Sequence, residues 1–106
     1  MKIEVVNRDY IFHVSREQLI NLINKGSKLE NTLLKQEFTL ERDMNLRSAE
    51  GIETYCLPDG SNFGNADNII IKVSPEVLER VRRGELVNAK YDEHNCLSIC
   101  KYDSKW

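Results

Sequence analysis

The sequence predicts an α+β fold: a mostly antiparallel sheet of about five to six strands, with two short helices packed on one face. Two observations predict it, namely short β-rich runs separated by turn residues, and two such runs that each lead into a serine-capped amphipathic segment. A third is the length of 106 residues, which suits a single globular domain over residues 1–106. The apolar fraction of 41% is ordinary for a soluble protein.

The first expected element is a β-hairpin. Residues 3–6 and 10–14 are β-rich, and Asn7-Arg8-Asp9 between them has the composition of a turn. A helix should follow directly, because Ser15 and Gln18 form a capping-box pattern in which each side chain accepts a hydrogen bond from a backbone N–H of the other. Gly26 is placed to adopt the left-handed conformation that ends helices.

The middle of the chain gives weaker signals, and the structure of residues 27–51 stays open. Leu29, Leu33 and Leu34 are compatible with a helical pattern, whereas residues 36–42 alternate with Phe38 and Leu40 on one side and favour a strand. Residues 44–51 resemble a connecting segment, and residues 52–57 form a further predicted strand that ends at Pro58.

Residues 58–68, PDGSNFGNADN, are the longest turn-rich segment and are predicted to form a loop. A loop of this length in a compact domain is the best candidate for a functional surface, although a mobile hairpin connection is the alternative. Its single aromatic residue is expected to be exposed. The candidate partner contacts in this loop are Asp59, Asn62, Phe63, Asn65 and Asp67.

A second strand leads into a second helix. Residues 69–73 alternate, Ser74 is the expected cap with Pro75 at the first helical position, and Gly84 ends the helix. The buried stripe is predicted to contain Val77, Leu78 and Val81, with Arg80, Arg82 and Arg83 mostly on the solvent side. Residues 86–91 and 96–102 then form a hairpin. The sequence leaves two alternatives for the tail, residues 103–106: the tail frays, or Trp106 folds back and packs on the core.

The two strand-helix segments, residues 10–26 and 68–84, resemble each other. Aligning Ser15 with Ser74 places Phe12 on Ile71 and Leu19 on Leu78. Such units could pack side by side across one sheet. Duplication would explain the similarity, but capping preference at any strand-to-helix junction also explains it and is the preferred interpretation.

The candidate catalytic and metal-binding groups do not form a convincing site. His94, Cys96 and Cys100 are metal-ligand types, but a strand over residues 96–102 would hold the two cysteines about 13 Å apart, too far for one ion. Cys56 with His13 or His94 is another nucleophile-base pairing, yet nothing nearby would lower the thiol pKa.

The 58–68 loop also resembles a calcium loop in part. Phe63 and Ile70, however, occupy two of its ligand positions. Phosphate loops and dinucleotide fingerprints are missing from the sequence. We therefore expect no catalytic residue, cofactor or metal, and a protein that is not an enzyme.

Charge and cysteine content limit the partners and the compartment. A net charge of −2 is too small to indicate a dominant electrostatic partner. No apolar run suits a signal peptide or a membrane span, and the three cysteines fit reduced thiols. The role of these thiols stays open. We expect a cytoplasmic protein without a membrane partner.

These observations favour a small cytoplasmic protein-binding module. Its most specific form would be an inhibitor or immunity-type partner of a larger enzyme, of the kind that phages and mobile elements encode. The alternative is a nucleic-acid-associated regulator that uses the arginine-rich helix end at Arg80, Arg82 and Arg83. Neighbouring glutamates there are more typical of a solvated face. A homodimer is also open, and the sequence does not identify the partner.

Overall fold

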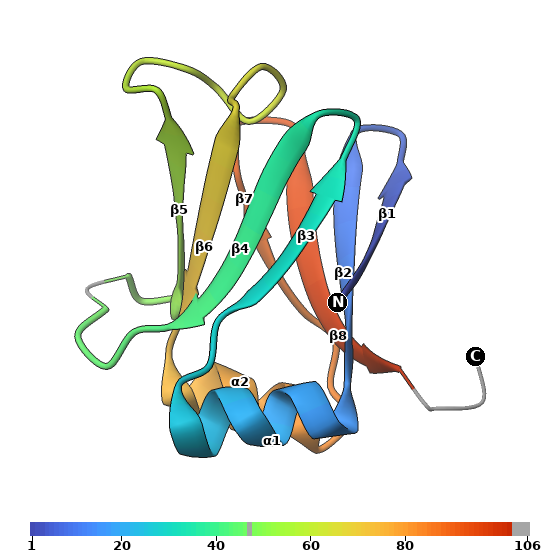
Figure 1. Ribbon diagram of the computed structural model, residues 1–106, viewed down its shortest axis with the longest axis vertical. Helices are drawn as coiled ribbons and strands as arrows, with labels where there is room; N and C mark the ends of the chain where they lie inside the picture. Colours follow the sequence, from blue (N-terminus) through green and yellow to red (C-terminus); the bar gives the residue numbers. More distant parts are fainter. Residues whose placement is uncertain (47, 103–106) are drawn as a thin grey trace.

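The computed structural model describes residues 1–46 and 48–102, so the predicted tail, residues 103–106, lies outside the described residues. Within these ranges the chain forms eight strands and two helices (Figure 1). In order they are β1 (Lys2–Val6), β2 (Asp9–Ser15), α1 (Arg16–Lys25), β3 (Leu29–Leu33), β4 (Gln36–Arg42), β5 (Ile52–Leu57), β6 (Asn68–Val73), α2 (Pro75–Arg82), β7 (Val87–Lys90) and β8 (Cys96–Tyr102).

The strands form two four-stranded mixed sheets rather than one. The strand orders are β1-β2-β8-β7 and β3-β4-β6-β5. The central pairs, β2 with β8 and β4 with β6, are parallel, and the outer pairs are antiparallel. The α+β class is confirmed. The prediction of a single sheet of five to six mostly antiparallel strands is wrong, because the eight strands of the described residues divide between two sheets. Each sheet is mixed because its central pair joins parallel strands from distant parts of the chain.

The two halves of the chain repeat one order of elements. β1, β2, α1, β3 and β4 are followed by β5, β6, α2, β7 and β8, and exchanging the halves converts one sheet order into the other. Each half contributes one hairpin to each sheet. The prediction that the two strand-helix units pack side by side in one sheet is therefore wrong, because β2 and β6 belong to different sheets.

Both helices lie together at one end of the two sheets (Figure 1). The predicted placement on one face of a sheet is therefore wrong. The predicted caps are confirmed: Ser15 Oγ accepts a hydrogen bond from the Gln18 N–H at 3.1 Å, Gln18 Oε1 accepts one from the Ser15 N–H, and Ser74 Oγ accepts one from the Val77 N–H at 3.3 Å. Among the described residues, no helix is long and apolar enough to cross a membrane.

The core lies between the sheets and against the helices. It contains alternate residues of β2, β4 and β6 and the predicted stripe of α2, and the fully buried side chains include Phe12, Phe38, Leu40, Ile71 and Leu78. The helical option for residues 29–34 is wrong, because these residues form β3 and half of a tight turn. Leu29 and Leu33 pack against the core, and Leu34 is 85% exposed in the turn.

Candidate functional site

All four connections between consecutive antiparallel strands lie at the end opposite the helices, which we call the hairpin end (Figure 1). Two are tight turns, Asn7-Arg8 and Leu34-Lys35, in which both central residues have positive φ. This geometry matches the twist of the strands that such turns join. The other two are the 58–67 loop and the 91–95 loop. The predicted functional loop therefore lies beside three other strand connections.

The 58–67 loop is held by its own polar groups and by β4. Asn62 Oδ1 accepts hydrogen bonds from the Gly64 N–H at 2.9 Å and the Asn65 N–H at 3.1 Å, and Asn65 Oδ1 accepts one from the Asn62 N–H at 2.8 Å. Gln36 Nε2 donates to the carbonyl oxygens of Phe63 and Ala66, both at 3.0 Å. The loop thus has a defined shape that is fixed to the sheets.

Phe63 is the main correction to the predicted site. The expected exposure is wrong, because only 4% of the residue is accessible. Its ring stacks on Tyr91 with centroids 4.2 Å apart and meets the edge of Tyr10 at 4.7 Å, and Phe38 lies beneath it at 6.0 Å. Phe63 closes the hairpin end of the core and is not an exposed anchor.

Two hollows lie at the hairpin end. The larger, a cleft of about 770 Å³, is bordered by Val5, Arg8, Tyr10, Ser61, Asn62, Phe63, Tyr91 and Asn95, among others. The smaller, of about 360 Å³, is lined by residues that include Leu34, Asn65 and Asp67. Tyr10 borders both. Around them the apolar side chains of Val5, Val6, Leu34 and Leu57 are exposed.

The 91–95 loop completes the cleft and is also locally ordered. Asp92 Oδ1 accepts hydrogen bonds from the backbone N–H groups of His94 and Asn95, both at 2.8 Å. Hydrogen bonds from the Asn95 side chain and the His94 backbone lower the pKa of Asp92. The Tyr91 hydroxyl donates to the Arg8 carbonyl, and burial raises the pKa of both Tyr91 and Tyr10.

The predicted site residues fall at two opposite ends of the molecule. Asp59, Asn62, Asn65 and Asp67 are exposed at the hairpin end. The three arginines belong to α2 and the residue that follows it, at the helix end. The structure therefore does not bring the two predicted groups into one surface.

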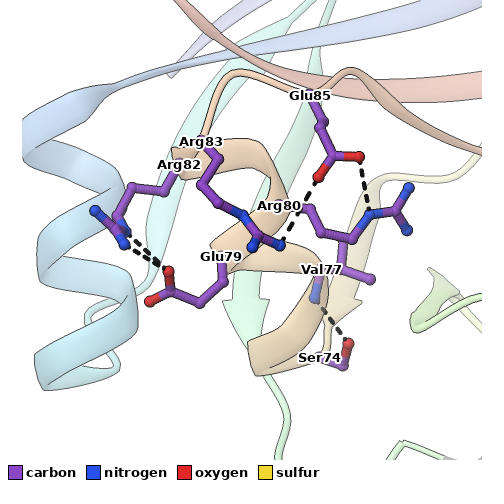
Figure 2. Close-up of polar contacts among 7 residues, drawn as sticks. All are labelled: Ser74, Val77, Glu79, Arg80, Arg82, Arg83 and Glu85. Carbon is purple, nitrogen blue, oxygen red and sulfur yellow. Dashed lines mark hydrogen bonds and ion pairs between the residues drawn. The ribbon is translucent and has the colours of Figure 1, made fainter.

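Each of the three arginines lies near a glutamate (Figure 2). Arg82 Nη2 is 2.8 Å from Glu79 Oε2, Arg80 Nε is 3.4 Å from Glu85 Oε1, and Arg83 Nη2 is 3.9 Å from Glu85 Oε2. These ion pairs leave little unbalanced positive charge for phosphate groups. The arrangement is that of a solvated helix face.

The residues that sequence reasoning missed line the cleft from the first and last hairpins: Val5, Arg8, Tyr10 and Tyr91. Strand alternation puts Tyr10 on the same face as Phe12, but nothing local indicates that Tyr91 meets it. Among the described residues, no three His, Cys, Asp or Glu side chains are grouped to hold a metal ion. Burial raises the pKa of the Cys56 thiol.

No protein-family model, curated protein or solved structure matches the chain in the three comparisons.

Proposed function

We propose that this chain is a small cytoplasmic protein-binding module, most specifically an inhibitor or immunity-type partner of a larger enzyme, and that the hairpin end is its binding surface. The observation that carries the proposal is the gathering of exposed apolar side chains around the hollows of this end. Val5, Val6, Leu34 and Leu57 are all more than a third exposed. Exposed apolar groups rimmed by polar ones are typical of protein interaction sites.

The polar groups of the two loops support the same surface. Asp59, Asn62, Asn65 and Asp67 surround the apolar side chains, and hydrogen bonds within the 58–67 loop already fix part of its backbone. A surface that is ordered before binding loses less conformational entropy in the complex. We therefore assign Phe63 an indirect role, in which its buried ring holds the contacting residues of the loop in place.

The test is capture of a partner from the source cell with tagged protein. Leu34→Asp and Val6→Asp place a charge on the proposed surface, and we expect each to reduce capture at least tenfold. Asp suits the positive φ of residue 34, so this change should not disturb the turn. The matched control is Leu86→Asp, since Leu86 is also exposed but lies beside the helix end, and it should capture normally.

Two outcomes would contradict the proposal. One is loss of capture in Leu86→Asp with normal capture in Leu34→Asp, which would move the surface to the other end. The second is capture that depends on nucleic acid: it would disappear with nuclease, weaken steeply with salt and require Arg82 and Arg83. Equilibrium sedimentation of the purified chain separates a homodimer from a foreign partner.

A further inference from the structure

A chain of three titratable side chains crosses the outer face of the first sheet, away from the cleft. His13 on β2 and Cys100 on β8 are register partners in the parallel pair. Cys100 Sγ lies 3.3 Å from His13 Nδ1, and His13 Nε2 lies 3.0 Å from Glu4 Oε1 on β1. A thiol, an imidazole and a carboxylate are thus connected in series.

Burial differs along this series in a way that suits proton transfer. His13 is only 5% exposed, so its ring orientation is fixed, whereas Cys100 is partly exposed. Because a carboxylate accepts hydrogen bonds, the contact with Glu4 favours the tautomer with its proton on Nε2. The lone pair of Nδ1 then faces the thiol. Strand alternation places Lys2 and Tyr102 on the same face of the sheet as these groups. Both residues are kept in all of the variants below.

The surroundings of Cys100 favour its thiol form over the thiolate. Burial, and then the charge of Glu4, raise the pKa of Cys100. The thiolate is the nucleophilic form, so a protonated thiol needs a neighbouring base before it can react. A nucleophile next to a base that a third group orients is the recurring arrangement of activated nucleophiles.

We propose that Cys100 is a modification site that reacts with small disulfides and alkylating electrophiles, with His13 Nδ1 accepting the thiol proton and Glu4 holding His13 through Nε2. With a disulfide, Cys100 Sγ attacks one sulfur, the new S–S bond forms as the old one breaks, and one thiolate leaves. The thiol proton passes to His13, and the leaving thiolate then takes it up through solvent. The disulfide is the oxidant: one of its sulfurs leaves as a free thiol and the other stays bonded to Cys100. With iodoacetamide, Sγ attacks the carbon that bears iodine, the S–C bond forms as the C–I bond breaks, and iodide leaves.

The experiment uses the full chain with Cys56→Ser and Cys96→Ser, so that Cys100 is the sole thiol. Modification by iodoacetamide and by neutral hydroxyethyl disulfide is followed by intact mass between pH 6 and pH 9. We expect His13→Gln to slow both reactions by about tenfold or more at pH 7, since general bases contribute on this scale. Its residual rate should rise with pH as that of an unassisted thiol does.

Glu4→Gln decides between two explanations that predict opposite signs. If Cys100 reacts as a simple thiolate, removing the Glu4 charge lowers the thiol pKa and speeds modification. If His13 is the base, the same change removes the charge that stabilises the imidazolium, and modification becomes several-fold slower. Glu4 is half exposed, so the variant should fold. Glu30→Gln, on the other sheet, is the matched control and should react like the parent.

A faster reaction in Glu4→Gln, or an unchanged rate in a folded His13→Gln chain, would overturn the proposal. Either result would mean that the three side chains are neighbours on the sheet and that His13 does not act as a base for Cys100. Circular dichroism and urea unfolding confirm folding of each variant.

Discussion

Gln36 is the side chain that ties the 58–67 loop to the sheets. Its Nε2 donates to two loop carbonyls, and the loop in turn places the Phe63 ring between Tyr10 and Tyr91. We expect Gln36→Ala to lower the free energy of unfolding by about 1–3 kcal/mol, because both carbonyls lose a partly buried donor. Urea unfolding measures the change.

The control for Gln36→Ala is Asn88→Ala, an exposed strand residue on β7, which should change the stability by less than about 0.5 kcal/mol. Equal stability of Gln36→Ala and the parent would show that water replaces the side chain, and that Phe63 and the hydrogen bonds within the loop are enough to hold it.

Tyr91 gives a prediction for alkaline pH. Burial is the first cause that raises its pKa, followed by the charge of Asp92. The folded state therefore keeps the phenol proton to higher pH than the unfolded state, so this contribution to stability is present below the unfolded pKa of about 10 and is lost as pH rises through the folded pKa. Urea unfolding should show stability falling above about pH 10.

The matched variant is Tyr91→Phe, which cannot ionise. Its stability should fall less steeply than that of the parent over the same pH range, although it starts lower because the hydrogen bond to the Arg8 carbonyl is lost. Parallel pH curves for the two proteins would show that Tyr91 titrates as it does in the unfolded chain.

At the scale of elements, each helix ends against a cation from a strand of its own half. Arg42 Nη1 on β4 donates to the Ile23 carbonyl near the end of α1, and Lys101 Nζ on β8 donates to the Arg82 carbonyl at the end of α2. The two cations are 59 residues apart in the sequence (42 to 101), and so are the two acceptors (23 to 82). The capping residues Ser15 and Ser74 have the same separation. The starts of the helices and these cation contacts are thus equivalent in both halves, although α1 extends to Lys25 and α2 ends at Arg82.

Substitution of these cations tests their role. Arg42→Met keeps the apolar stem and should cost about 1.5–3 kcal/mol, because a partly buried charged hydrogen bond to a helix carbonyl is lost. Lys101→Met should cost less than about 1 kcal/mol, because that contact is exposed. Lys90→Met on β7 is the control. Thermal unfolding that ranks Lys101 above Arg42 would contradict the argument.

Gly26 leaves room for the guanidinium of Arg42. It has φ of 65°, and a Cβ at this position would lie 2.8 Å from Arg42 Nη2. The sequence pattern explained this glycine only as a helix end. Its second role, leaving space for a guanidinium from β4, depends on a contact between elements that local patterns do not contain.

At the scale of the whole molecule, the elements were largely predictable and their pairing was not. Alternation and capping located β2, α1, β4, β6 and α2, because each depends on neighbouring residues. Residues 29 and 33 were ambiguous, since a spacing of four fits both a helix turn and one face of a strand. The parallel pairs were out of reach because Phe12 meets Ile99, and Phe38 meets Ile69, across long stretches of chain.

The same reasoning explains the error at Phe63. A lone aromatic residue among turn residues suggested exposure, but its burial depends on Tyr10 from the first hairpin and Tyr91 from the last. The repeat held more information than its helix caps. With Ser15 on Ser74, Phe38 and Leu40 align with Leu97 and Ile99, 59 residues further on (38 to 97 and 40 to 99), and all four are fully buried.

The arrangement of the halves predicts how the chain behaves when it is cut. Each half supplies one hairpin to each sheet, and the two parallel pairs join hairpins from different halves. A half alone would leave the inner faces of both of its hairpins in water, and isolated hairpins are marginally stable at best. We expect fragments 1–46 and 47–106 to be unfolded separately and to recover the native circular dichroism spectrum and cooperative unfolding when mixed.

The stability of the mixed fragments should depend on their concentration, because association then replaces a covalent link. Arg42→Met in the first fragment acts within its own half, so it should weaken the complex by the same free energy that it removes from the intact chain. Cooperative unfolding of fragment 1–46 alone would contradict the prediction. It would mean that one ββαββ half forms a core without the hairpins that the other half contributes to each sheet.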